Sequence, residues 1–145
     1  MPEDIDFIHD LGSNEKDFSA DGKENVFWPK KTLLGLVNSK IDVALKLVVQ
    51  GKIVGFCLVM IHPVTKKAVL ENFYVLEGFE RFINDFYKEV EKHIKLKGAQ
   101  FIAYFFDVED DVNNIDFFKK SGYFVGNNHL WLHKNINFSN PFKKE

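Results

Sequence analysis

The stretch from Val75 to Asn84, VLEGFERFIN, joins the end of an apolar segment to the start of a charged, amphipathic one. A strand that turns into a helix exposes backbone N–H groups, and the helix dipole adds partial positive charge, so such turns often hold phosphate. Phosphate-binding turns usually contain several glycines, because the backbone must approach the anion closely. This turn has one, Gly78, with Glu77 and Glu80 beside it. We therefore expect a poor anion site, in which the Glu80 carboxylate lies near the freed amides and partly replaces the missing anion.

Glu71 is a second candidate for chemistry. It stands beside Asn72 in an otherwise apolar run, AVLENFYV. Partial burial there favours a carboxylate that accepts a proton near neutral pH, which suits a general base. The alternative is a structural carboxylate that is satisfied by the backbone or by a lysine.

The cysteine and histidine side chains are weaker candidates for a catalytic or metal-binding role. Cys57, the single cysteine, lies inside an apolar segment, which indicates an inert core thiol. His129 and His133 flank Trp131 on one expected strand face, but no further ligands stand at metal spacing. We therefore predict no metal site.

The composition bounds the class of protein. A chain of 145 residues that is 46% hydrophobic suits one domain over residues 1–145, with residues 135–145 as a tail. A net charge of −2 gives no basic footprint for nucleic acid. The acidic N-terminus is no signal peptide, and the apolar runs are far shorter than the roughly 20 residues of a membrane span. With one cysteine, these features predict a cytoplasmic protein that binds neither nucleic acid nor membrane.

Hydrophobic periodicity predicts the elements that position these residues. A polar loop is expected over 12–25, a short helix within 28–40, and three strands over 43–49, 52–61 and 68–75. The clearest element is a helix over 79–97, whose apolar stripe includes Phe79 and Phe82, so both rings are expected to pack inward. A strand over 101–106, a helix over 112–122 and a hairpin over 123–134 complete the order. Because a strand–helix–strand crossover implies parallel pairing, 68–75 and 101–106 should be parallel neighbours in a mixed α/β sheet.

This order resembles the GNAT superfamily of N-acetyltransferases, roughly from Phe27 to Lys134. FWPKKTLLGLVNS resembles the second helix of the family, LVVQGKIVGFCLVMIHPVTKKAVLENFYV its second to fourth strands, and IDFFKKSGYFVGNNHLWL its last helix and final hairpin. The resemblance implies a mixed, largely antiparallel sheet of six to seven strands, with a parallel strand 4–strand 5 pair and helices on both faces.

The resemblance also implies a place for acetyl-CoA, between strands 4 and 5. The pantetheine arm would pair with the backbone of the strand over 68–75, at Phe73 and Val75. The pyrophosphate would lie on the turn that contains Gly78, Phe79 and Arg81.

The turn departs from the family's Arg/Gln-x-x-Gly-x-Gly/Ala motif. Counted forward from Val75, the first position falls on Glu80 and the glycines on Ile83 and Asp85; counting back from Gly98 restores the motif no better. Bulky side chains at the glycine positions keep phosphate oxygens away from the amides. We therefore expect acetyl-CoA binding to be weak or absent.

Two positions near the last helix would also meet the co-substrate. A family tyrosine that protonates the departing thiolate corresponds to Phe118, which cannot donate a proton. A common asparagine corresponds to Asp111, which lacks the amide donors. Several family members use a glutamate near Glu71 to take the proton of the substrate ammonium.

The leading hypothesis is an acyl-CoA-dependent N-acyltransferase, in which an amine attacks the thioester directly. Glu71 would assist deprotonation, and solvent would protonate the thiolate. The acceptor would be a small-molecule amine or a protein or peptide amine. The alternative is a non-catalytic binding or interaction module that has lost its pyrophosphate site. The oligomeric state stays open, and a homodimer is one option.

Overall fold

The computed structural model describes residues 4–14, 27–104, 112–124 and 126. The chain divides into two compact units, Met1–Asp111 and Val112–Glu145. The first unit contains a sheet with three α-helices, and the second contains helix α4 (Val112–Lys120). The single domain expected over residues 1–145 stays a prediction.

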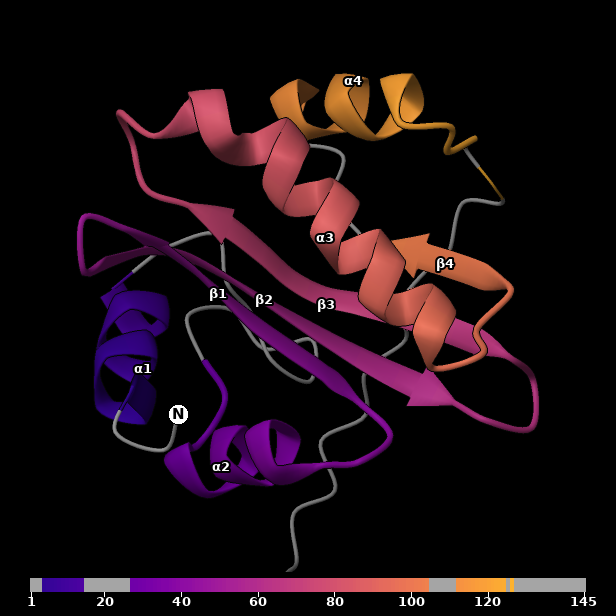
Figure 1. Cartoon of the computed structure of the whole chain (residues 1–145), viewed down its shortest axis with the longest axis horizontal. Helices are drawn as coiled ribbons and strands as arrows, with labels where there is room; N and C mark the ends of the chain where they lie inside the picture. Colours follow the sequence, from indigo (N-terminus) through magenta and orange to yellow (C-terminus); the bar gives the residue numbers. More distant parts are fainter. Residues whose placement is uncertain (1–3, 15–26, 105–111, 125, 127–145) are drawn as a thin grey trace, which may run out of the picture. The chain divides into compact units, whose positions relative to one another are not determined.

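The sheet of the first unit has four strands in its described part, in the order β1-β2-β3-β4 (Figure 1). Their bounds are β1 (Val43–Val49), β2 (Lys52–His62), β3 (Lys67–Val75) and β4 (Phe101–Tyr104). β2 is antiparallel to both β1 and β3, whereas β3 and β4 are parallel. The predicted parallel pair is therefore confirmed. The six to seven strands are not shown, since residues 105–106 and most of the predicted hairpin over 123–134 lie outside the described residues.

Helices cover both faces of this sheet (Figure 1). α1 (Ile5–Asn14) and α2 (Lys30–Asn38) share one buried cluster with β2, made of Ile5, Ile8, Phe27, Leu33, Leu36, Phe56 and Leu58. On the other face, Phe73 of β3 stacks on Phe86 of α3 (Ile83–Leu96), with ring centroids 5.3 Å apart. The β2 partner of Phe73 is Cys57, the neighbour of Phe56. Because neighbours on a strand point to opposite faces, α3 packs opposite α1 and α2.

The helix expected over 79–97 begins later than predicted. A 3-10 turn, η2 (Glu80–Phe82), comes first, and the α-helix starts at Ile83. The buried stripe of α3 consists of Phe86, Tyr87, Val90 and Ile94. None of the described helices has the length and apolarity that crossing a membrane requires.

Helix α1 was not expected from the sequence. It includes residues 12–14, which were predicted as loop; the rest of that loop, residues 15–25, lies outside the described residues. Asp6 pairs with Lys30 of α2 at 2.7 Å, and Asp4 pairs with Lys46 of β1 at 2.5 Å. Lys30 holds the pKa of Asp6 below its usual value, and Lys46 does the same for Asp4. These two ion pairs and the shared cluster connect α1 to α2 and to the sheet.

Candidate functional site

β4, as far as the structure describes it, pairs with only the first part of β3. The two strands pair from Lys67 with Phe101 to Leu70 with Tyr104, and β4 as described ends there. Glu71–Val75 continues β3 with β2 on one side and, in the described part of the chain, no strand on the other. The N–H and C=O groups of such an edge can pair with an extended ligand.

A β-bulge lies where this open edge begins. The pairing of β2 with β3 passes from Leu58–Asn72 to Val59–Leu70, so Glu71 is the extra residue. Bulges bend a strand and re-aim a side chain, and they are common beside active sites. Glu71 is half-buried. The sequence placed a carboxylate in this strand, and the structure places it at the one irregular position of the β2–β3 pairing.

Asn72, the residue after the bulge, has a fixed partner. It is buried, with 4% of its surface exposed, and its Oδ1 accepts a hydrogen bond of 2.8 Å from Trp28 Nε1. Phe27 and Trp28 lie just before α2. Phe27 is buried, with its ring 6.0 Å from that of Phe56 in an edge-on arrangement. Both side chains therefore anchor the segment before α2, and Trp28 does so at the bulge. Sequence reasoning missed this hydrogen bond, although an Asn in an apolar strand signals a buried partner.

The turn after β3 is occupied by one of its own carboxylates. Gly78 has a φ of +90°, a backbone conformation that favours glycine, and its N–H donates to Glu80 Oε1 at 2.9 Å. The Gly78 N–H, and next the N–H of Glu80 itself, lower the pKa of this carboxyl below its usual value. The expected position of Glu80, beside the freed amides, is confirmed.

Other amides of the turn also have partners inside the protein. Phe79 N–H donates to Leu76 O at 3.1 Å, and Phe82 N–H donates to Phe79 O at 3.0 Å. Ile83 N–H donates to Glu80 O. These three amides and that of Gly78 are therefore not free for an anion.

Arg81 and its two aromatic neighbours form a separate group on this turn. Its guanidinium lies 4.5 Å from the centroid of the Phe82 ring, and Nη1 donates to Gly78 O at 3.3 Å. Phe79 and Phe82 stack on each other with centroids 6.5 Å apart. The expectation that both rings pack inward as anchors is met only in part, since each ring is half-buried and stacks on the other. The rings of the later stripe, Phe86 and Tyr87, already fill the space over Phe73.

The remaining candidates lie elsewhere. Phe118 is buried, and its ring meets that of Tyr123 edge-on at 5.1 Å within the second unit. Burial raises the pKa of the Cys57 thiol, which keeps it protonated and unreactive. Asp111, His129 and His133 lie outside the described residues.

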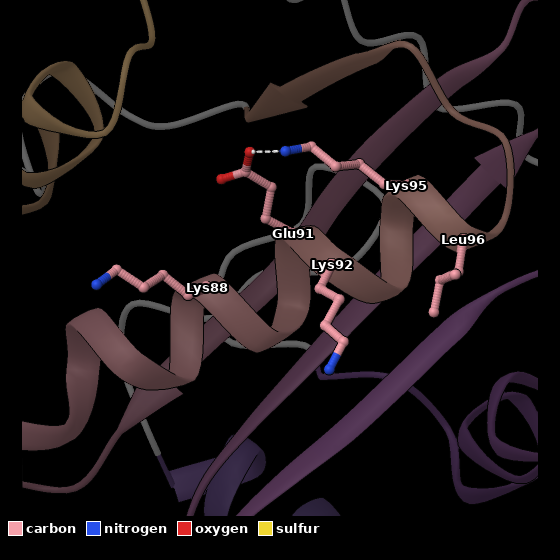
Figure 2. Close-up of a pocket in the computed structure, with 5 residues that line it drawn as sticks. All are labelled: Lys88, Glu91, Lys92, Lys95 and Leu96. Atoms are coloured by element: carbon pink, nitrogen blue, oxygen red, sulfur yellow. Dashed lines mark ion pairs between the residues drawn. The ribbon is translucent and has the colours of Figure 1, made fainter.

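Two of the hollows in the described part of the structure adjoin α3, and neither is lined by residues of β3. One, of about 460 Å³, lies along the helix and is lined by Lys88, Glu91, Lys92, Lys95 and Leu96 (Figure 2). Glu91 pairs with Lys95 there at 2.9 Å. The other, of about 340 Å³, lies between α3 and β1. The first is a row of surface side chains on one helix, so it offers no convergent chemistry.

No model of a protein family matches the sequence, and no curated protein does. Solved structures do match. A protein described as a GNAT-family acetyltransferase from Xanthomonas campestris pv. campestris is 18% identical, with a TM-score of 0.62 over 85% of this chain and 78% of that one. An aminoglycoside N-acetyltransferase, AAC(6')-Iy in complex with CoA, is 15% identical, with a TM-score of 0.59 over 74% of this chain and 87% of that one. A transcriptional regulator from Bacillus halodurans C-125 is 12% identical, with a TM-score of 0.71 over 92% and 95%.

The chain has a GNAT fold. Identities this low establish the fold alone. Within the GNAT fold, β3 and β4 correspond to the strand 4–strand 5 pair that the resemblance predicted. The structure places Glu71, Phe73 and Val75 on one continuous strand, with Gly78, Phe79 and Arg81 in the turn that follows. The side chain of Phe73 packs against Phe86 and Tyr87 of α3, so it is not part of the candidate site.

The GNAT fold implies a co-substrate with two chemically different parts, and the residues fit them unequally. The open edge of β3 over Glu71–Val75 suits the amide groups of a pantetheine arm, because backbone pairing needs no particular side chain. The turn does not suit a pyrophosphate, because the Glu80 carboxylate already accepts the Gly78 N–H.

Proposed function

We propose that this protein is an N-acyltransferase that moves an acyl group from a thioester, nominally acetyl-CoA, to an amine. The observation that carries the proposal is the parallel β3–β4 pair in a GNAT fold, with a bulge at Glu71 where the open edge begins. The acetyltransferases among the solved structures with this fold, one of them in complex with CoA, support acyl transfer as the class of reaction. The acceptor is a small-molecule amine or a protein or peptide amine, and the site of action is the cytoplasm.

A bound thioester would supply the electrophilic carbonyl carbon. The backbone of Glu71–Val75 would hold the arm extended, which orients that carbonyl toward an incoming amine. Glu71 would take the proton of the ammonium, directly or through a water, so that the nitrogen lone pair can attack. The C–N bond would then form as the C–S bond breaks, the nitrogen would lose its extra proton to solvent, and the sulfur would leave as a thiolate. Solvent would protonate the thiolate, since Phe118 has no proton to give.

Glu71→Gln tests the role of the base. The amide keeps the size of the side chain but cannot accept a proton, so kcat should fall about 10- to 100-fold, while the Kd for CoA stays within about twofold. Turnover is measured as release of free thiol over a panel of amines. The loss should be smaller with a weakly basic amine that is already unprotonated at neutral pH, which a purely structural role would not produce.

Glu89→Gln, an exposed substitution on α3, is the matched control and should leave turnover unchanged. Full activity of Glu71→Gln on protonated amines would remove Glu71 from the mechanism.

A second candidate function is a non-catalytic binding or interaction module. The hydrogen bond from Gly78 to Glu80 favours it, since the turn has lost its space for an anion. Absence of thiol release with every amine, together with a retained fold, would favour this module over the enzyme.

A further inference from the structure

We propose that Glu80 sets the donor class of this protein: a thioester that carries a pantetheine arm and needs no nucleotide pyrophosphate. The inference rests on the proposed function, because it concerns the donor of that same reaction. It starts from the unequal fit of the two parts of the site.

The Glu80 carboxylate acts as an internal ligand of the turn. It is tied to the same short segment as Gly78, whose N–H it accepts at 2.9 Å, so its local concentration is high. A phosphate that took this N–H would have to displace one anion with another. The exchange forms one charge-assisted hydrogen bond and breaks one, so little free energy remains for binding.

The other charged side chains of the turn also disfavour a bound phosphate. Glu77 adds a second exposed negative charge two residues after Val75. The positive charge of Arg81 lies over the face of Phe82, and its Nη1 donates to Gly78 O. A nucleotide diphosphate would therefore meet two carboxylates and one arginine that already has partners.

No such competition between two anions arises along the edge of β3 that faces no strand in the described part of the chain. A pantetheine arm is uncharged between its sulfur and its phosphate, and its amides can pair with the backbone of Glu71–Val75. The part of the donor near the thioester can therefore bind without the nucleotide. The nucleotide should contribute almost nothing to affinity, in contrast to its role where a glycine-rich turn holds it.

The test compares CoA, pantetheine and ADP by NMR titration of the wild-type protein and two variants. For wild type, the Kd values of CoA and pantetheine should agree within about threefold, and ADP should cause no saturable shift. Glu80→Ala frees the Gly78 amide, so CoA should bind about tenfold or more tightly than to wild type, the equivalent of about 1.4 kcal/mol. Its affinity for pantetheine should not change, and ADP should now bind.

Glu77→Ala is the matched control. It removes one negative charge from the same turn without freeing the Gly78 amide, so CoA affinity should change by less than about threefold. Both positions are exposed, so both variants should fold, which their melting temperatures check.

Two outcomes would overturn the proposal. One is a wild-type Kd for CoA that is more than about tenfold below that of pantetheine; the other is no gain in CoA affinity for Glu80→Ala. Absence of pantetheine binding to wild type and to Glu80→Ala would be a different pattern. It would show that the edge of β3 over Glu71–Val75 does not bind a pantetheine arm. The proposed function would then be wrong, and so would the assignment of the donor.

Discussion

At the scale of single residues, Glu71 and Glu80 are the same side chain in two backbone settings. Glu80 lies on the surface, yet two backbone N–H groups hold it as a carboxylate and lower its pKa. Glu71 is half-buried at a bulge, where the strand itself positions it. The first setting fixes a negative charge, whereas the second is the one in which we propose a general base.

Phe118→Tyr should leave the fold intact and raise acyl transfer modestly. The GNAT resemblance assigns Phe118 the place of the family's acid, where an added hydroxyl would protonate the thiolate. The hydroxyl must also find a partner, because a buried unpaired hydroxyl costs about 1–3 kcal/mol. Thiol release and the melting temperature check both parts. Unchanged transfer at equal CoA affinity would show that solvent already acts as the acid.

Single residues also show the limit of sequence reasoning. Glu80 was expected near the amides because the turn lacks the glycines that a bound anion needs. This contact could be predicted because both of its partners, Gly78 and Glu80, lie in the same short turn. Phe79 and Phe82 were expected to be buried because they fit the helical period. Periodicity assigned them to α3, but the helix starts at Ile83, and the 3-10 turn before it rotates the stripe.

At the scale of elements, two helical glycines differ in what surrounds them. A Cβ on Gly12 of α1 would lie 2.4 Å from the Phe27 ring, whereas a Cβ on Gly35 of α2 would meet nothing within 4 Å. Gly12→Ala should therefore destabilise by about 1–3 kcal/mol through overpacking. Gly35→Ala should stabilise by about 1 kcal/mol through helix propensity.

Urea unfolding of the two variants measures both effects. Because the chemical change is identical, each variant is the control for the other. Stabilisation by Gly12→Ala would mean that α1 does not lie against Phe27.

The elements predicted best were those with strong patterns. β1 matches its predicted bounds, and β2 and β3 each differ from theirs by only one residue. The bounds were predictable because Gly and turn residues end the apolar runs of these strands. α1 was missed because Gly12, Ser13 and Asn14 are typical of loops. The spacing of Ile5 and Ile8 was a helical signal, but it is short, and tertiary packing on Phe27 decides the outcome.

At the scale of the whole molecule, CoA should stabilise the protein only slightly. We expect a Kd in the high micromolar range or weaker, so about 1 mM CoA should raise the Tm by about 2 °C or less. Differential scanning fluorimetry measures this, with sodium phosphate at matched ionic strength as the control. A rise well above about 6 °C would correspond to a low-micromolar Kd and would contradict the reading of the turn.

The fold itself could be predicted from the sequence, and its ligand could not. The strand–helix–strand order required the β3–β4 pair to be parallel, and the structure confirms it. The hydrogen bond between Gly78 and Glu80, on which the proposal about the donor rests, was expected from the charges and missing glycines of the turn, and no pattern of apolar residues encodes such a contact.

The hydrogen bond between Trp28 and Asn72 has a practical consequence. The chain contains two tryptophans, and Trp131 is the other. In a Trp131→Phe protein all tryptophan emission would therefore come from Trp28, whose indole Nε1 lies 2.8 Å from Oδ1 of Asn72, the residue next to Glu71. The fluorescence of an indole depends on its hydrogen bond and its polarity. The fold thus carries its own optical reporter beside the candidate site, and ligands can be screened against it without any label.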